Sequence, residues 1–105
     1  MNRRLFVVIR TRGPAWHADR PLEAQPDWAA HASFMNALAA EGFVVVGGPL
    51  EGTADTVLVI RAESSEEIRA RLAADPWAVT DQLRVTRIAP WNVRLGSLDA
   101  RGARS

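Results

Sequence analysis

Residues 43–60 read FVVVGGPLEGTADTVLVI, and this stretch restricts the chain to few architectures. The run from Phe43 to Val46 is aromatic and β-branched, which predicts a strand, and we expect Gly47-Gly48-Pro49 to end it. Turn-forming residues follow at 51–55, and the run from Thr56 to Ile60 predicts another strand. Because the connection between the two runs is short, we expect them to pair antiparallel.

Before this pair, the sequence predicts one strand, one long loop and one helix. Leu5–Arg10 is a strand whose apolar residues would occupy both faces. Thr11–Asp27 contains four Gly or Pro residues and mixed charge, so we expect a loop of a length that is often functional. Asp27 is placed to cap a helix from Trp28 to Glu41, and Gly42 to terminate it.

After the pair, the sequence predicts a second helix and a fourth strand. Ser64 and Glu67 have the spacing of a capping box, which marks a helix start. We expect Asp75-Pro76 to end this helix and a last strand to run from Arg84 to Trp91, after a short turn.

The resulting order, βαββαβ, is that of an α+β ferredoxin-like fold, with a four-stranded antiparallel sheet and two helices on one face. The other face would carry either Val57 and Val59 or Leu58 and Ile60. A face this apolar is unfavourable in water, so we expect it to pair with a second sheet, as in a homodimer.

Composition limits the domain count and the function classes. We expect one domain over 1–95 and a flexible tail over 96–105, where Gly, Ser, Arg and Ala dominate. The charged residues, 13 basic and 12 acidic, are scattered, so no nucleic-acid partner is expected. The chain has no Cys, which excludes disulfides and thiol chemistry. The apolar run near the N-terminus is too short for a membrane span or a signal peptide, and we expect a cytoplasmic protein without a membrane partner.

Two residues are candidates for proton chemistry. His31 follows Trp28 by one turn and precedes Met35 by one turn, which places it on the buried side of the first helix. A buried imidazole can transfer protons, or it can be a core residue whose nitrogens are satisfied. Asp75 precedes Pro76, the arrangement of a helix N-cap, and its carboxylate could also orient His31.

Other residues are candidates for ligand binding. Gly48 and Pro49 lie where backbone can approach a ligand closely, although such a segment can also be a simple turn. Arg10, at the end of the first strand, could meet an anionic substrate. His17 and Asp19 form no metal-ligand pattern, and we expect no metal site. Four tryptophans could line an aromatic pocket or anchor the core and an interface: Trp16, Trp28, Trp77 and Trp91.

An ordered set of motifs resembles the YCII-related family over Leu5 to Trp91. The set comprises His31, Gly42-Phe43, Gly47-Gly48-Pro49, Asp75-Pro76-Trp77 and Pro90-Trp91. The resemblance implies a dimeric α/β barrel and a His/Asp active site, which maps onto His31 and Asp75. Some members of the family resemble dehalogenating enzymes of aromatic degradation. The first loop is longer here than in compact members.

Two functions remain open at this point. The first is a small cofactor-free enzyme of the isomerase, dehydrohalogenase or lyase type, acting on a small cyclic or aromatic molecule. In it His31 would move the proton and Asp75 would set its tautomer, while Arg10, Gly48, Pro49 and Trp77 would bind the substrate. The second is a non-catalytic dimeric module that binds or senses a small ligand. Only the enzyme needs a His31 that is both open to a cavity and hydrogen-bonded to a carboxylate.

Overall fold

A computed structural model describes residues 3–98 of the chain. The elements, in order, are β1 (Arg4–Arg12), the short 3-10 helix η1 (Leu22–Ala24), α1 (Trp28–Ala40), β2 (Val44–Pro49), β3 (Asp55–Ala62), α2 (Ser65–Leu72), α3 (Pro76–Val79) and β4 (Leu83–Pro90). The predicted βαββαβ order is confirmed. The third helix, α3, forms where a plain turn was expected, because Asp75 and Pro76 start a new helical turn there.

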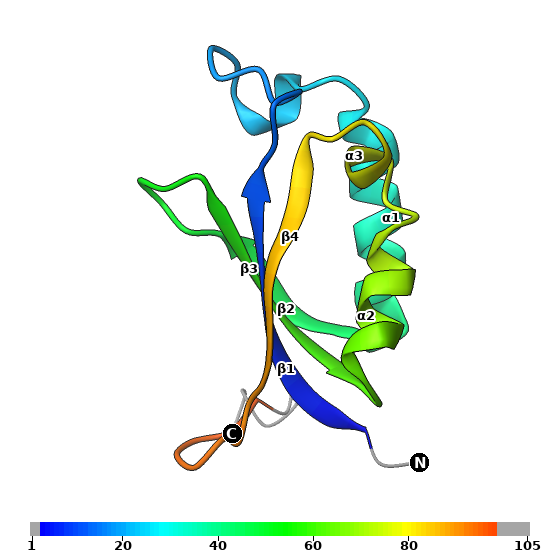
Figure 1. The fold of residues 1–105 in the computed structure, drawn as a ribbon, viewed down its shortest axis with the longest axis vertical. Helices are drawn as coiled ribbons and strands as arrows, with labels where there is room; N and C mark the ends of the chain where they lie inside the picture. Colours follow the sequence, from blue (N-terminus) through cyan, green and yellow to red (C-terminus); the bar gives the residue numbers. More distant parts are fainter. Residues whose placement is uncertain (1–2, 99–105) are drawn as a thin grey trace.

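The four strands form one antiparallel sheet with the order β2-β3-β1-β4. The three α-helices lie together on one side of this sheet, and its other side is bare in the single chain (Figure 1). This is the predicted ferredoxin-like α+β architecture. Dimerisation through the bare face stays a prediction.

The core lies between the sheet and the helices. Phe6 and Val8 of β1 and Leu58 and Ile60 of β3 point into it, where they join apolar residues of the helices. Full burial of one such side chain stabilises the fold by about 1.5–3 kcal/mol. Two residue pairs of β3 were candidates for the face away from the helices, and Leu58 and Ile60 prove to be the pair that faces the helices. Val59 pairs with Val7 in the register of β1 and β3, on the opposite face.

The start of α1 differs from the prediction. Asp27 occupies the N-cap position, but its φ is 62° and its side chain makes no capping hydrogen bond. In this left-handed conformation the Asp27 side chain does not reach the first amides of the helix, so the predicted side-chain cap is wrong. The predicted end is confirmed: Gly42 has a φ of 86°, which favours glycine after a helix.

The expectation that Gly47-Gly48-Pro49 ends the second strand is wrong, because all three residues belong to β2. An edge strand tolerates a proline, since one side of it needs no ladder hydrogen bonds. A Cβ on Gly47 would lie 2.5 Å from Leu58 Cδ2 and 3.0 Å from the Val57 carbonyl oxygen. Glycine at 47 therefore allows close strand packing rather than a turn.

The helix start at Ser64 is confirmed. Ser64 Oγ accepts a hydrogen bond of 3.1 Å from the Glu67 amide. The Glu67 carboxylate accepts a hydrogen bond of 2.8 Å from the amide of Glu63. In the usual capping box the donor is the amide of the N-cap residue itself, one position later.

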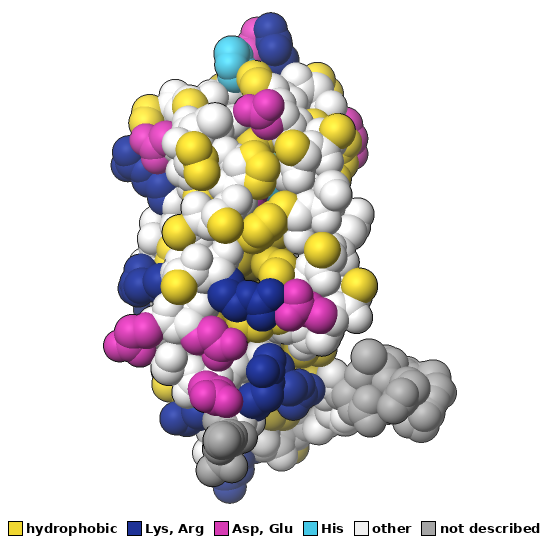
Figure 2. Space-filling view, turned by 90° about the vertical axis from the view of Figure 1, so that its right-hand side faces the viewer, with side chains coloured by type: hydrophobic (Ala, Val, Ile, Leu, Met, Phe, Trp, Pro, Cys, Tyr) yellow, Lys and Arg dark blue, Asp and Glu magenta, His cyan; other side chains and the backbone are white. Residues whose placement is uncertain are grey.

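The helix side of the molecule carries mixed charge. Figure 2 shows basic and acidic side chains interspersed over its lower half, with apolar side chains above them. Some of these opposite charges form ion pairs. Arg71 of α2 pairs with Glu41, which follows α1, at 2.7 Å. No single-sign charged surface forms on this face.

Residues beyond β4 belong partly to the predicted tail. Residues 96–98 line a hollow together with residues that include Leu5 and Arg61. The rest of the predicted tail, 99–105, falls outside the described residues. Within 3–98, no helix is both long and apolar enough to cross a membrane.

Candidate active site

His31 and Asp75, 44 positions apart in sequence, are in direct contact. His31 Nδ1 lies 2.9 Å from both Oδ1 and Oδ2 of Asp75. His31 comes from the second turn of α1, and Asp75 comes from the N-cap of α3, which packs against α1. The predicted approach of the two side chains is therefore present.

Asp75 is fully buried, with 0% of its surface exposed. Three donors surround its carboxylate: His31 Nδ1, Arg10 Nη1 at 2.8 Å and the Trp77 amide at 2.9 Å. Burial alone would raise the pKa of the Asp75 carboxyl. The hydrogen bonds from His31, Arg10 and Trp77 together outweigh burial, so that the pKa of Asp75 lies below its usual value. The carboxylate is thus held ionised, and it caps α3 and orients His31 at once.

The ionised carboxylate fixes the tautomer of His31. A carboxylate only accepts, so the ring proton of neutral His31 resides on Nδ1, and Nε2 carries a free lone pair. Within residues 3–98 the one buried side-chain nitrogen or oxygen without a partner is Arg10 Nε. Nε2, for which the described residues provide no partner, is therefore not sealed in the core. This combination makes Nε2 available as a proton acceptor.

Trp77 fixes the orientation of the His31 ring. Its indole stacks on the His31 ring with centroids 3.8 Å apart and an interplanar angle of 8°. An indole face also favours a cation, so it would stabilise the imidazolium formed after proton uptake.

Trp77 is itself tied to the first loop. Trp77 Nε1 donates to the Pro26 carbonyl at 2.7 Å, and Gln82 Nε2 donates to the same oxygen at 3.1 Å. The buried Gln25 closes the loop by accepting from the His17 amide and donating to the carbonyls of His17 and Arg20. The long loop is thus anchored to the turn that carries Asp75.

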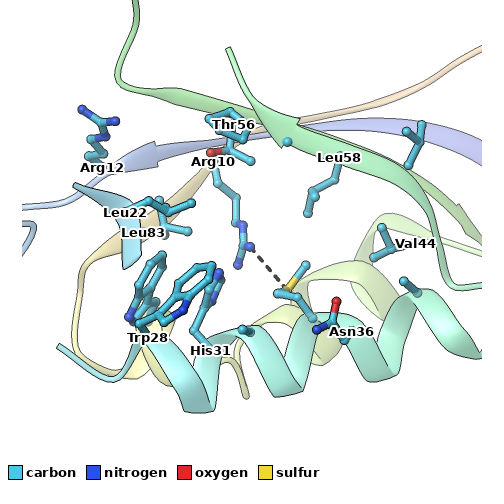
Figure 3. Close-up of a pocket in the computed structure, with 18 of the residues that line it drawn as sticks. Arg10, Arg12, Leu22, Trp28, His31, Asn36, Val44, Thr56, Leu58 and Leu83 are labelled. Carbon is cyan, nitrogen blue, oxygen red and sulfur yellow. Dashed lines mark hydrogen bonds between the residues drawn. The ribbon is translucent and has the colours of Figure 1, made fainter. Parts of the chain in front are cut away.

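Arg10 lies at the base of the site, only 2% exposed. Besides its ion pair with Asp75, its Nη2 contacts Met35 Sδ at 3.5 Å, and a thioether is a weak acceptor. Figure 3 shows its side chain passing from β1 toward α1, beside the His31 ring. A guanidinium with one strong acceptor for five N–H donors is short of partners.

A cavity of about 440 Å³ opens beside these residues, between α1, β2 and the end of β1. This volume is within the range of small-molecule sites. Its walls are largely apolar or aromatic, and they include Trp16, Trp28, Trp77, Met35, Leu58 and Leu83. Figure 3 shows Trp28, Leu58 and Leu83 among them. His31 lines this cavity, and Asp75 lies behind His31, outside the lining.

The other predicted ligand-binding residues are all on the cavity lining: Arg10, Gly48, Pro49 and Trp77. Their role in binding stays a proposal. His17 is exposed on the loop, and Trp91, 40% exposed, does not line the cavity. In the described part of the chain, no three His, Cys, Asp or Glu residues gather as a metal site would require.

Sequence reasoning missed the Arg10–Asp75 ion pair and the place of Arg12. Arg12 lies two positions after Arg10, and alternation along a strand puts both on one face. That signal was available in the sequence. The pairing of Arg10 with Asp75, 65 positions apart, had no local signal.

Comparison with known proteins identifies a family and similar solved structures. The YCII-related domain model matches residues 5–92. The 5-chloro-2-hydroxyhydroquinone dehydrochlorinase of Burkholderia phenoliruptrix, solved in complex with 2,5-dihydroxybenzoquinone, superposes with a TM-score of 0.62 and 25% identity, over 84% of this chain and 93% of that one. Among curated proteins, none matches. The family match spans nearly the whole fold and includes His31 and Asp75, and the chain therefore belongs to the YCII-related domain family.

Proposed function

We propose that this protein is a small enzyme in which His31 and Asp75 transfer a proton on a small cyclic or aromatic molecule. One observation carries the proposal: a buried, ionised carboxylate holds Nδ1 of His31 while the ring lines a ligand-sized cavity. A sealed core histidine would have no such opening. A general base needs both an orienting partner and access to substrate.

The chemistry is isomerisation or elimination of the dehydrohalogenase or lyase type. Nε2 takes a proton from a C–H or O–H of the substrate, and the released electron pair forms a new double bond. In an elimination this pair expels the leaving group, for instance chloride, and the proton on Nε2 later passes to water. In an isomerisation His31 returns the proton to another atom of the same molecule. Asp75 and the Trp77 face stabilise the intermediate imidazolium.

Arg10 has two roles in this proposal. It keeps Asp75 ionised through their ion pair, and its guanidinium, which lines the cavity, meets an oxygen of the substrate beside His31. Negative charge that develops on that oxygen during proton removal would be stabilised by the guanidinium. Gly48, Pro49 and Trp77 supply the walls that hold the ring.

The similar solved structure suggests where to search for a substrate. It is a dehydrochlorinase with a quinone bound, so chlorinated hydroxyhydroquinones are the first compounds to test. Chloride release and product absorbance report elimination. Deuterium uptake from D₂O, followed by proton NMR, reports proton transfer even without a leaving group.

The decisive comparison is His31→Gln against His17→Gln. The two variants remove the same group, one on the cavity lining and one on an exposed loop. We expect His31→Gln to lower turnover or exchange by about 10²–10⁴-fold, the usual contribution of a general acid or base, and His17→Gln to change it little. Equal rates for the two variants would contradict the proposal. Binding without turnover in the wild-type protein would leave the chain a ligand-binding module.

We also propose that the protein is a homodimer joined through the bare face of the sheet. Val7, Ile9 and Val57 on this face are only partly buried in the single chain, and Val46 is 52% exposed. A second sheet packed there would remove this apolar surface from water.

A further inference from the structure

The charge on the cavity lining has one sign. Its ionisable residues are Arg10, Arg12 and His31, and no Asp or Glu of the described residues contributes to it. The nearest carboxylate, Asp75, is sealed behind His31. Because the surrounding walls are apolar, positive charge in such a cleft is focused rather than screened. The cavity therefore favours a ligand that brings negative charge.

Of the two guanidiniums, only that of Arg12 has no carboxylate partner among residues 3–98. The Arg10 charge is already matched by Asp75 at 2.8 Å. The Arg12 side chain is exposed, and it lies over the Trp16 ring, whose centroid is 4.6 Å from Cζ. Contact with a ring uses the guanidinium face and leaves its N–H donors free. Those donors remain available to an incoming oxyanion.

The ring beneath Arg12 begins a row that leads to His31. Trp16 meets Trp77 edge to face, with centroids 5.3 Å apart, and Trp77 stacks on the imidazole. Trp28 lies against both Trp77 and His31, at 5.8 and 6.0 Å. Trp77 itself is fully buried, so a flat ring in the cavity would pack against the partly exposed Trp16 and Trp28, between Arg12 and His31.

We propose that the ligand is a planar, ring-based organic anion, and that Arg12, supported by Trp16, binds its charged oxygen group. Arg12 is thus a specificity-determining residue, distinct from the His31–Asp75 pair. The inference rests on the proposed use of this cavity as the ligand site, but it does not require that the bound molecule react.

The test uses binding rather than turnover, with two probes of the same shape. Titration calorimetry compares 4-hydroxybenzoate, an anion at neutral pH, with 4-hydroxybenzamide, which is uncharged. We expect the wild-type protein to bind the carboxylate about tenfold more tightly, the size of one partly exposed charge-assisted contact. Raising the salt concentration should reduce this preference.

Arg12→Gln and Arg20→Gln separate a specific contact from general charge. Both remove one positive charge, Arg12 at the end of β1 and Arg20 in the loop that follows, but Arg20 does not line the cavity. We expect Arg12→Gln to abolish the preference for the carboxylate and Arg20→Gln to retain it. Because the Arg12 side chain is exposed, the variant should keep the melting temperature of the wild type, which is measured alongside.

Three results of these titrations would overturn the inference, and a fourth comes from the His31 variant below. The three are equal binding of the two probes by wild type, equal loss of the preference in the two Arg variants, and no binding of either probe at millimolar concentration. The same titration with His31→Gln separates this inference from the proposed function. A retained carboxylate preference there supports Arg12 as the anchor even if no turnover is ever found, and a preference lost with His31 alone would contradict it.

Discussion

Replacing Asp75 by Asn tests how far the site is built around one buried charge. Asn keeps the shape of the side chain and can still accept from the Trp77 amide, so the α3 cap should survive. The charge that balances Arg10, 2% exposed and 2.8 Å away, is lost. Breaking a buried pair by removing one partner costs about 3–5 kcal/mol. We expect Asp75→Asn to lower the free energy of unfolding by about 3 kcal/mol at pH 7.

The effect should depend on pH in one direction. The folded protein lowers the pKa of Asp75 below its ordinary value of about 3.9. Such a group contributes stability above its unfolded pKa, and the contribution is lost as pH falls through the lower folded pKa. The difference in free energy of unfolding between wild type and Asp75→Asn should therefore be largest at neutral pH and decrease below about pH 4.

Urea unfolding at fixed protein concentration measures both quantities, since a dimer would make stability concentration-dependent. The double variant Arg10→Met/Asp75→Asn supplies the control, because it removes the unpaired cation as well. We expect it to recover about 2 kcal/mol relative to Asp75→Asn alone. A loss under about 1 kcal/mol for Asp75→Asn, or a gap that persists unchanged in acid, would refute this account of the site.

Three further results are expected. Gly47→Ala should destabilise the fold by about 1–2 kcal/mol because its Cβ would overlap Leu58, whereas Gly48→Ala, with nothing within 4 Å, should be neutral or slightly stabilising. Light scattering at micromolar concentration should give twice the 11.5 kDa chain mass. Val46→Glu, on the exposed part of β2, should shift this mass toward the monomer without unfolding the chain.

Each of these results has an outcome that would contradict it. Equal effects of the two alanine substitutions would show that Leu58 and its strand move aside at little cost. A monomer mass for the wild type would remove the barrel model. An unchanged dimer in Val46→Glu, with an unchanged melting temperature, would place the interface elsewhere.

Several features of the fold depend on local chemistry alone, and the amino-acid sequence predicts them. The β-branched runs predicted the four strands, and the Ser64–Glu67 spacing predicted the start of α2. The spacing of His31 to Trp28 and Met35 placed the imidazole on the buried side of α1. These features depend on neighbours within a turn or a strand, so short sequence windows contain the information.

Other features contradicted local preference because distant segments prevailed. Gly47-Gly48-Pro49 has the composition of a turn, yet β3 provides a ladder that draws it into the sheet. Asp is a common N-cap residue, yet Asp27 adopts a left-handed conformation at the start of α1. The carbonyl of the preceding residue, Pro26, accepts hydrogen bonds from Trp77 and Gln82. Propensity is a weak prior when tertiary contacts oppose it.

The amino-acid sequence by itself therefore determines which residue types can transfer a proton and which face of the helix carries His31. It does not determine how these residues come together. Arg10, His31 and Asp75 come from β1, α1 and the N-cap of α3. Only packing of α3 against α1 and the sheet brings Arg10 and His31 each within 3 Å of the Asp75 carboxylate. The tautomer of His31 and the ionised state of Asp75 follow from that contact, because a buried carboxylate keeps its charge only where donors from separate elements converge on it.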